Sequence, residues 1–238
     1  MNSLYGKRIP LFYLFLLLFF SLKTVAQSGV VGAIRENNTV YLTDINGLPF
    51  PAKTAEGISG SPWLSEEWNT GSVQFAFGKR ADSILLKFNL AHNKVLFRRS
   101  NDPYEFVLPV QEFRFSYSDS GTIKTAYYKS GYPDIGKNTG LSFYEMLAEG
   151  AKLHLLQYNY RKLTETYVFN GPPVFQYEPY TQLYLYDADT KTMHRIKCRK
   201  QSVTGAVPKL AEAINRLCSE KKWTLKNTEE LAMLVRAL

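Results

Sequence analysis

Residues 72–90 read SVQFAFGKRADSILLKFNL, and this stretch decides the fold. Apolar side chains occupy every second position on both sides of a polar turn at residues 78–82. A period of two residues is typical of a β-strand that buries one face. The stretch therefore predicts a β-hairpin with two apolar rows facing the core: Val73, Phe75 and Phe77 in one strand, and Ile84, Leu86, Phe88 and Leu90 in the other.

The same alternation continues along the chain and predicts further hairpins. Polar turns at residues 91–94 and 118–121 separate the first of these runs. Strands are expected at residues 104–108, 113–117, 123–128, 152–163, 166–169, 181–186 and 192–198. Short turns between such runs favour antiparallel neighbours. We therefore expect a mainly β fold of the α+β class, built as an antiparallel meander sheet or an open barrel.

One short helix is expected in the middle of the chain, at about residues 143–149. Ser142 and Glu145 have the spacing of a capping box, in which each side chain accepts a hydrogen bond from a free backbone N–H group. Gly150 is suited to the left-handed turn that ends a helix. These three residues predict both ends of the helix.

The C-terminal residues, about 207–238, are expected to form a helical hairpin. Pro208 suits a first helical turn, and Asn227 or Thr228 suits the N-cap of a second helix. Two apolar stripes recur at steps of three and four residues: Leu210, Ala213, Ile214, Leu217 and Cys218, and then Leu231, Leu234, Val235 and Leu238. Because neither stripe is stable in water, we expect the pair to pack on the sheet.

Residues 1–26 have the features of a cleaved secretory signal peptide. Lys7 and Arg8 precede the apolar run at residues 11–20, and Ala26 offers a small residue before the cut. The run is shorter than the roughly 20 apolar residues that a membrane-spanning helix needs. We therefore expect a periplasmic or extracellular protein without a membrane span, and a single β-rich domain at residues 27–238.

Charge and cysteine content limit the classes of partner and scaffold. The formal charge of +8 falls to +5 without the three cations of residues 1–26, and Lys and Arg are dispersed along the chain. This pattern indicates weak contact with anionic envelope polymers and no specific nucleic-acid partner. Cys198 and Cys218 are the only cysteines, which excludes a disulfide-rich scaffold. They either pair in an oxidising compartment or remain two buried thiols.

Residues 44–71 lack any period and contain Trp63 and Trp68 among several glycines and prolines. A long aperiodic segment in a compact domain is usually functional or packs over the core as a cover. An indole ring buries a large area in either role. The two tryptophans are therefore either core anchors or a platform for a glycan or a lipid headgroup, and they are the candidate ligand-binding residues.

No residue pattern predicts catalysis, a metal site or a cofactor. His92, His154 and His194 each stand alone, without the spacing of metal ligands. Residues 57–61 contain a serine between glycines, but in a loop rather than at the strand-to-helix turn of a hydrolase nucleophile. Glycoside hydrolysis needs two carboxyl groups at a set separation. Glu66, Glu67, Glu145 and Glu149 are the candidates, and no pattern in the sequence places two of them at that separation.

Several motifs resemble a set of exported proteins of unknown function found in Bacteroidota. These are residues 60–64 (GSPWL) with Trp68 and Gly71, the strand at residues 85–90, and residues 143–147 (FYEML). The closing helical pair is also similar, so that the resemblance covers most of the chain after residue 26. Where the resemblance leads us to expect a tyrosine in the first hairpin turn, this chain has Arg80 and Ala81. The resemblance implies export and brings no catalytic residue with it.

Three functions follow as hypotheses. The first is a non-catalytic exported envelope protein, because the leader is clear and reactive clusters are missing from the sequence pattern. The second is a glycan- or lipid-headgroup-binding module that uses residues 44–71. The third is a small secreted hydrolase, which requires a cleft with a histidine within hydrogen-bond reach of a nucleophile and beside a carboxylate.

Overall fold

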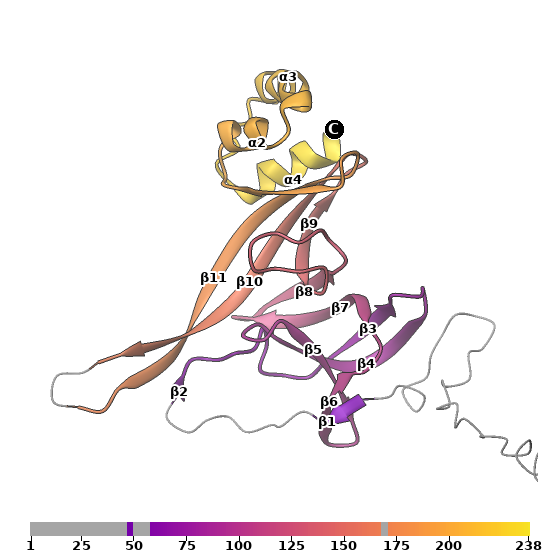
Figure 1. The fold of residues 1–238 in the computed structure, drawn as a ribbon, viewed down its shortest axis with the longest axis vertical. Coiled ribbons are helices and arrows are strands. Elements are labelled where there is room, and N and C mark those ends of the chain that lie inside the picture. The colour runs from indigo at the N-terminus through magenta and orange to yellow at the C-terminus, as the bar shows by residue number, and fades with distance from the viewer. Residues whose placement is uncertain (1–46, 50–57, 168–170) are drawn as a thin grey trace, which may run out of the picture. The chain divides into compact units, whose positions relative to one another are not determined.

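The computed structural model describes residues 47–49, 58–167 and 171–238 (Figure 1). The expected signal peptide, residues 1–26, lies outside this part, as do residues 50–57 of the aperiodic segment. The described strands are β1 (Gly47–Pro49), β2 (Ile58–Ser59), β3 (Asn69–Phe75), β4 (Arg80–Asn89), β5 (Lys94–Arg99), β6 (Asp102–Phe106), β7 (Val110–Asp119), β8 (Thr122–Lys129), β9 (Tyr144–Glu149), β10 (Leu153–Thr166), β11 (Val174–Asp187) and β12 (Thr192–Ile196). The described helices are α2 (Lys200–Ala206), α3 (Ala211–Lys221) and α4 (Thr228–Ala237), with a 3-10 turn at Pro208–Leu210.

All described strands belong to one open, mostly antiparallel sheet in the order β1-β6-β5-β4-β3-β7-β8-β9-β10-β11-β12, with β2 beside β11. Each pair is antiparallel except β2 and β11, which are parallel. Strands β3 to β6 and β7 to β12 are two meanders, joined where β3 pairs with β7. The expectation of a mainly β fold is therefore confirmed.

The hairpin predicted at residues 72–90 consists of β3 and β4, with Gly71 opposite Ile84. Its apolar rows are buried as predicted, except for Phe77, which follows the end of β3 and is 53% exposed. Gly71 is required by close packing, because a Cβ atom there would lie 2.2 Å from the carbonyl oxygen of Arg114 in β7.

Aromatic rings fill the core between β3–β8 and the segment before β9. The Phe88 ring centroid lies 5.0 Å from that of Phe113, 4.8 Å from that of Tyr128 and 6.0 Å from that of Phe143. All four side chains are buried. Such contacts add to the free energy gained from area burial alone, so Phe88 lies at the centre of this core.

The prediction of a short helix at residues 143–149 is wrong, because Tyr144–Glu149 form β9 between β8 and β10. Ser142 accepts a hydrogen bond from the backbone N–H of Thr139, and Glu145 accepts from Asn159. Neither side chain caps a helix. Pairing with two strands outweighs a local capping signal.

Gly150 has a different role from the helix-ending turn that we expected. A Cβ atom at this position would lie 2.1 Å from the carbonyl oxygen of Val235 in α4. Helix α4 also contacts β9 and β10, and Arg236 donates to the carbonyl oxygen of Leu147 over 2.9 Å. Gly150 therefore lets the end of α4 approach the sheet closely.

Replacing Gly150 with alanine is expected to lower the free energy of unfolding by about 1–3 kcal/mol, because the clash is with backbone and α4 must move. Gly205 in α2 is the matched control, since a Cβ atom there meets nothing within 4 Å. Alanine at Gly205 should instead raise stability by about 0.5–1 kcal/mol. Urea denaturation of both variants measures the two effects, and equal values for the two would contradict the assignment.

The two C-terminal helices expected at about residues 207–238 are confirmed as α3 and α4, and the preceding α2 was not predicted. The Asn227 side chain caps α4 by accepting from the backbone N–H of Glu230 over 2.8 Å. Apolar residues of the helices pack with β9 to β12 in a second core that includes Leu155, Leu185, Ile214, Leu231 and Leu234. In the described part of the chain, no helix has the length and apolarity needed to cross a membrane.

Strands β10 and β11 pair over 14 residues each, so β10 continues past the boundary expected at residue 163. The prediction of a separate strand at residues 166–169 is therefore wrong at its first residue, because Thr166 is the last residue of β10. Residues 168–170 lie outside the described part. Pro179 lies in β11 between the segments that pair with β2 and β12. Because proline has no N–H to donate, it protects this strand edge from pairing with another chain.

Candidate functional site

Trp63 and Trp68, the two residues chosen from the sequence, line one pocket of about 470 Å³. Both indoles are half-buried. The opposite wall consists of residues from β4, β5 and the β5–β6 turn, among them Lys87, Leu96 and Asn101. The volume lies within the usual range for small-molecule sites, about 300–1,000 Å³.

The segment before β3 is held along the end of β4 by backbone hydrogen bonds. The backbone N–H of Leu64 donates to the carbonyl oxygen of Phe88 over 3.0 Å, and that of Leu90 donates to Pro62 over 2.7 Å. Trp63 is thus paired with Asn89, in line with the pairing of β3 and β4. Residues 65–68 loop out between these two paired parts and carry the second tryptophan.

Gly60 begins this segment in a conformation that favours glycine. Its φ is +75°, and a Cβ atom there would lie 2.8 Å from the carbonyl oxygen of Tyr177 in β11. Ile58 and Ser59 pair with β11 just before it. The pocket wall is therefore anchored to the sheet at both ends, which favours a preformed site over one that folds on binding.

A cation lies over each indole. Lys87 Nζ is 4.7 Å from the ring centroid of Trp63, and the guanidinium carbon of Arg98 is 5.8 Å from that of Trp68. Such cation–π contacts contribute about 0.5–1 kcal/mol at exposed sites and more when desolvated. The Lys87 side chain is only 12% exposed. These contacts fix the orientation of both rings.

The polar groups of the pocket are centred on Glu66. Lys87 Nζ donates to the Glu66 carbonyl oxygen over 2.5 Å and lies 3.8 Å from its carboxylate, while the Ser61 hydroxyl donates to the same carboxylate. Burial lowers the pKa of Lys87, and the neighbouring Glu66 opposes this shift. The pocket thus combines two indoles, a paired carboxylate and the amide of Asn101.

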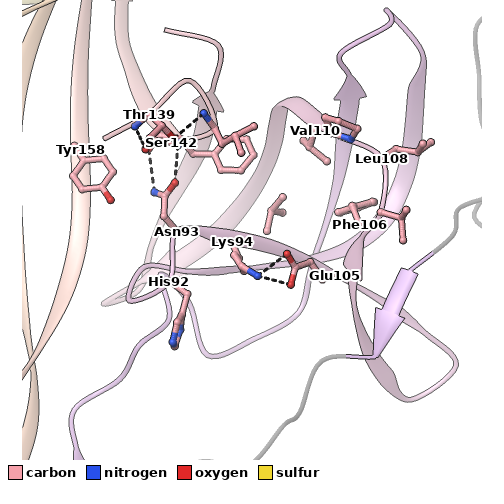
Figure 2. Close-up of a pocket in the computed structure, with 15 residues that line it drawn as sticks. His92, Asn93, Lys94, Glu105, Phe106, Leu108, Val110, Thr139, Ser142 and Tyr158 are labelled. Carbon is pink, nitrogen blue, oxygen red and sulfur yellow. Dashed lines mark hydrogen bonds and ion pairs between the residues drawn. The ribbon is translucent and has the colours of Figure 1, made fainter. Parts of the chain in front are cut away.

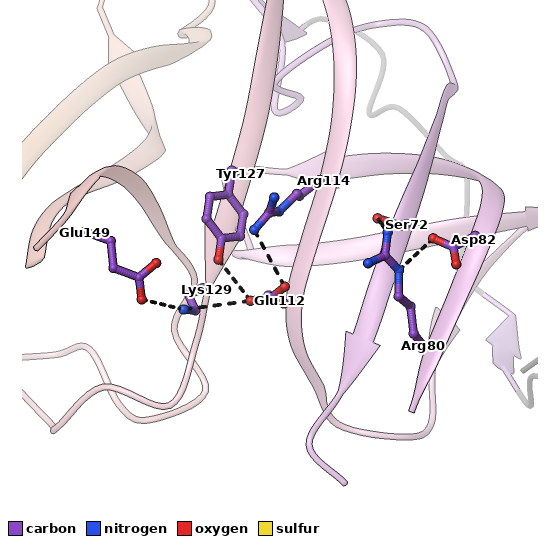
Figure 3. Close-up of polar contacts among 8 residues, drawn as sticks. All are labelled: Ser72, Arg80, Asp82, Glu112, Arg114, Tyr127, Lys129 and Glu149. Carbon is purple, nitrogen blue, oxygen red and sulfur yellow. Dashed lines mark hydrogen bonds and ion pairs between the residues drawn. The ribbon is translucent and has the colours of Figure 1, made fainter. Parts of the chain in front are cut away.

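One histidine lies beside a carboxylate and a hydroxyl, as the hydrolase hypothesis requires. His154 Nε2 is 3.8 Å from Glu149, and Nδ1 is 3.0 Å from the Tyr132 hydroxyl. However, the Glu149 carboxylate is also bound by Lys129 over 3.0 Å (Figure 3). Burial raises the pKa of Tyr132 and lowers that of His154. A buried phenol that resists ionisation is a poor nucleophile, and none of these residues lines the tryptophan pocket.

The remaining polar face of β3, β4, β7 and β8 carries interspersed charges (Figure 3). Arg114 lies 3.6 Å from the Tyr127 ring centroid, and the Tyr127 hydroxyl donates to Glu112 over 3.0 Å. Arg80 pairs with Asp82 over 2.7 Å in the same view. Cations and carboxylates neutralise one another here, so this face does not concentrate charge of one sign.

The carboxylates of β9 do not form a catalytic pair. Glu145 lies opposite Gln157 and Glu149 opposite His154, and a register shift separates these two pairs. Because Gln157 and His154 are three residues apart in β10, they point to opposite faces of the sheet. The two carboxylates therefore lie on opposite faces, which does not fit the geometry of glycoside hydrolysis.

Glu145 is half-buried and accepts hydrogen bonds from Asn159 over 2.6 Å and Gln157 over 3.4 Å. Burial raises its pKa above the ordinary 4.5, and the hydrogen bond from Asn159 opposes this shift. As the pH rises above about 4.5, the unfolded chain releases this proton before the folded protein does, so stability falls.

Replacing Glu145 with glutamine is expected to remove this pH dependence. The variant should gain stability relative to the natural protein as the pH rises from 4.5 to neutrality. Thermal unfolding at several pH values measures the difference, with Glu165→Gln in the exposed part of β10 as the control. A difference between the Glu145 variant and the natural protein that is constant with pH would contradict the assignment.

The other residues considered from the sequence lie apart from the pocket. His92 contacts the Asn89 side chain, and His194 contacts Thr192 over 3.0 Å.

Cys198 and Cys218 are free cysteines that pack in the helical core, and burial raises the pKa of both thiols. Within residues 47–49, 58–167 and 171–238, no group of three or more His, Cys, Asp and Glu residues is arranged to hold a metal ion.

Sequence reasoning found the two tryptophans but missed their partners. Lys87 appears in the sequence as an ordinary polar position of a strand, and Leu96 and Asn101 belong to a different hairpin. Only the register of β4 with β5 brings Lys87 opposite Leu96. Comparison of the chain with models of known protein families, with curated proteins and with solved structures gave no match.

Proposed function

We propose that the protein is a non-catalytic, exported binding protein of a bacterial envelope, and that the pocket between Trp63 and Trp68 holds a sugar ring of a glycan. The observation that carries the proposal is that both tryptophans line the same pocket, together with a carboxylate and an amide. Export rests on the leader-like residues 1–26 and on the resemblance to exported proteins.

The chemistry of the walls favours a glycan. A sugar ring presents an apolar C–H face, which stacks on indoles, and hydroxyl groups, which both donate and accept hydrogen bonds. Glu66 supplies acceptor atoms, and the Asn101 amide supplies a donor and an acceptor. Orienting polar groups in a mainly apolar pocket are typical of small-molecule sites.

A phosphate-bearing headgroup fits this pocket less well. Lys87 is the cation that lines it, and it is already bound to Glu66. A phosphate would have to compete with that carboxylate and would be repelled by it. We therefore assign a neutral glycan to the pocket rather than an anionic lipid headgroup.

Tryptophan fluorescence tests the proposal directly. The sequence has three tryptophans, so a Trp223→Phe variant keeps only the two in the pocket. Its emission is expected to change with neutral oligosaccharides in a saturable manner and to remain unchanged with vesicles of anionic phospholipid. A response to the vesicles alone, or to neither, would contradict the assignment.

A further inference from the structure

A second pocket, of about 480 Å³, lies between the β4–β5 turn, the β6–β7 connection and the loop before β9 (Figure 2). Its Val95 lies on the core face of β5, whereas Lys94 lies on the other face, together with Leu96, which lines the tryptophan pocket, and with Glu105, which is paired with Leu96. The pocket thus takes residues from both faces of β5, and none of its lining residues lines the tryptophan pocket.

Two of the pocket's walls are joined by one side chain. Asn93, in the β4–β5 turn, accepts a hydrogen bond from the backbone N–H of Phe143 over 2.7 Å and donates to the carbonyl oxygen of the same residue over 3.3 Å. Its φ of 54° is one that asparagine tolerates better than most residues. The loop before β9 is thus fixed to the turn, so the pocket is preformed.

One side of the pocket is apolar and reaches the surface. Val95 and Phe143 are buried, and Phe106, Leu108 and Val110 are partly buried beside the aromatic core. Two further lining residues are exposed: Val107 at 51% and Leu141 at 77%. Exposed apolar residues that border an apolar cavity are typical of a ligand-binding groove.

The other side of the pocket carries one charge of each sign. Lys94 Nζ lies 2.7 Å from the Glu105 carboxylate, and both side chains are partly exposed (Figure 2). An exposed pair of this kind contributes little to stability, so its groups are available to exchange partners. His92 Nδ1 lies 3.2 Å from the side-chain oxygen of Asn89, and the tautomer that donates to this oxygen has Nε2 as an acceptor.

We propose that this pocket binds a single-chain zwitterionic amphiphile, with the hydrocarbon chain against the apolar wall and a phosphoethanolamine headgroup at Lys94 and Glu105. The phosphate would pair with Lys94, and the ammonium would donate to Glu105 and His92. A headgroup with only a negative charge would pair with Lys94 but would be repelled by the neighbouring Glu105 carboxylate. A headgroup with both charges satisfies both side chains.

Calorimetric titration with decanoyl lysophosphatidylethanolamine, kept below its micelle concentration, tests this site. Saturable binding is expected, and the corresponding lysophosphatidylglycerol should bind more weakly by roughly tenfold because its net negative charge is repelled by Glu105. Free phosphoethanolamine, which lacks the chain, should give no measurable heat. Equal binding of the two lysolipids, or binding of neither, would overturn the proposal.

Two exposed residues supply a matched pair of variants. Leu141→Asp places a charge in the apolar wall and is expected to weaken binding by roughly tenfold or more. Ile123→Asp makes the same kind of change at a residue that is 72% exposed and does not line the pocket, and binding should be unchanged. Equal binding by both variants would place the lipid elsewhere. Thermal unfolding of each variant verifies that it is folded.

A third variant tests the assignment of the headgroup. Glu105→Gln removes the negative charge, and the preference for phosphoethanolamine over phosphoglycerol is expected to disappear while the chain still binds. A preference that persists in this variant would contradict the role of Glu105. None of these outcomes depends on the tryptophan pocket, so this site and the proposed glycan site can fail independently.

Discussion

Replacing Trp68 with alanine is expected to weaken the binding of a neutral oligosaccharide roughly 30-fold, since removal of an anchoring tryptophan costs about 2 kcal/mol or more. Trp68 lies in the looped-out residues 65–68 rather than in the paired segment that holds Trp63. The loss should therefore appear in affinity while the free energy of unfolding changes little. Isothermal titration calorimetry and urea denaturation of the same variant measure the two quantities.

The control for Trp68 is the third tryptophan. Trp223 packs in the helical core and does not line the pocket. The variant Trp223→Phe should therefore bind the oligosaccharide with unchanged affinity. If Trp68→Ala retained full affinity, or if Trp223→Phe lost it, the pocket would not be the glycan site.

The largest effect on stability is expected from Phe88→Ala. This ring contacts three other buried aromatic rings, and its removal leaves a cavity between β4, β7 and β8. Truncation of a buried phenylalanine costs about 3–5 kcal/mol. For a chain of this size the loss corresponds to a fall in Tm of about 10 °C.

Phe77→Ala is the matched control, because this ring is 53% exposed beyond the end of β3. Its removal should change the free energy of unfolding by no more than about 0.5 kcal/mol. Differential scanning calorimetry compares both variants with the natural protein. A similar loss in the two variants would mean that the aromatic core is not centred on Phe88.

The strands were predictable because their signal is periodic and long. Alternation over residues 72–90 requires one buried face, and the structure buries that face except at Phe77. The helical stripes before and after Asn227 were predictable for the same reason. Residues 143–149 were mispredicted because a capping box depends on only two side chains, whereas β9 is stabilised by pairing with distant strands.

The candidate site was only half predictable. Trp63 and Trp68 stand out in the sequence because they are large and rare, and they occur in a segment without periodicity. Their partner Lys87 does not stand out, since a lysine on the polar face of a strand is ordinary. Its closeness to Trp63 arises because the segment before β3 continues along the end of β4. The pocket that contains Asn93 and Leu141 is formed by three loops that are far apart in the sequence, so no local sequence pattern predicts it.

The indole N–H resonances of the isotope-labelled protein give the most direct test of the glycan pocket. One signal arises from each of the three tryptophans, and substitution of each in turn assigns it. On addition of a neutral oligosaccharide, the signals of Trp63 and Trp68 are expected to shift together in a saturable manner while that of Trp223 stays in place. Saturable binding that leaves both pocket signals unmoved would contradict the account.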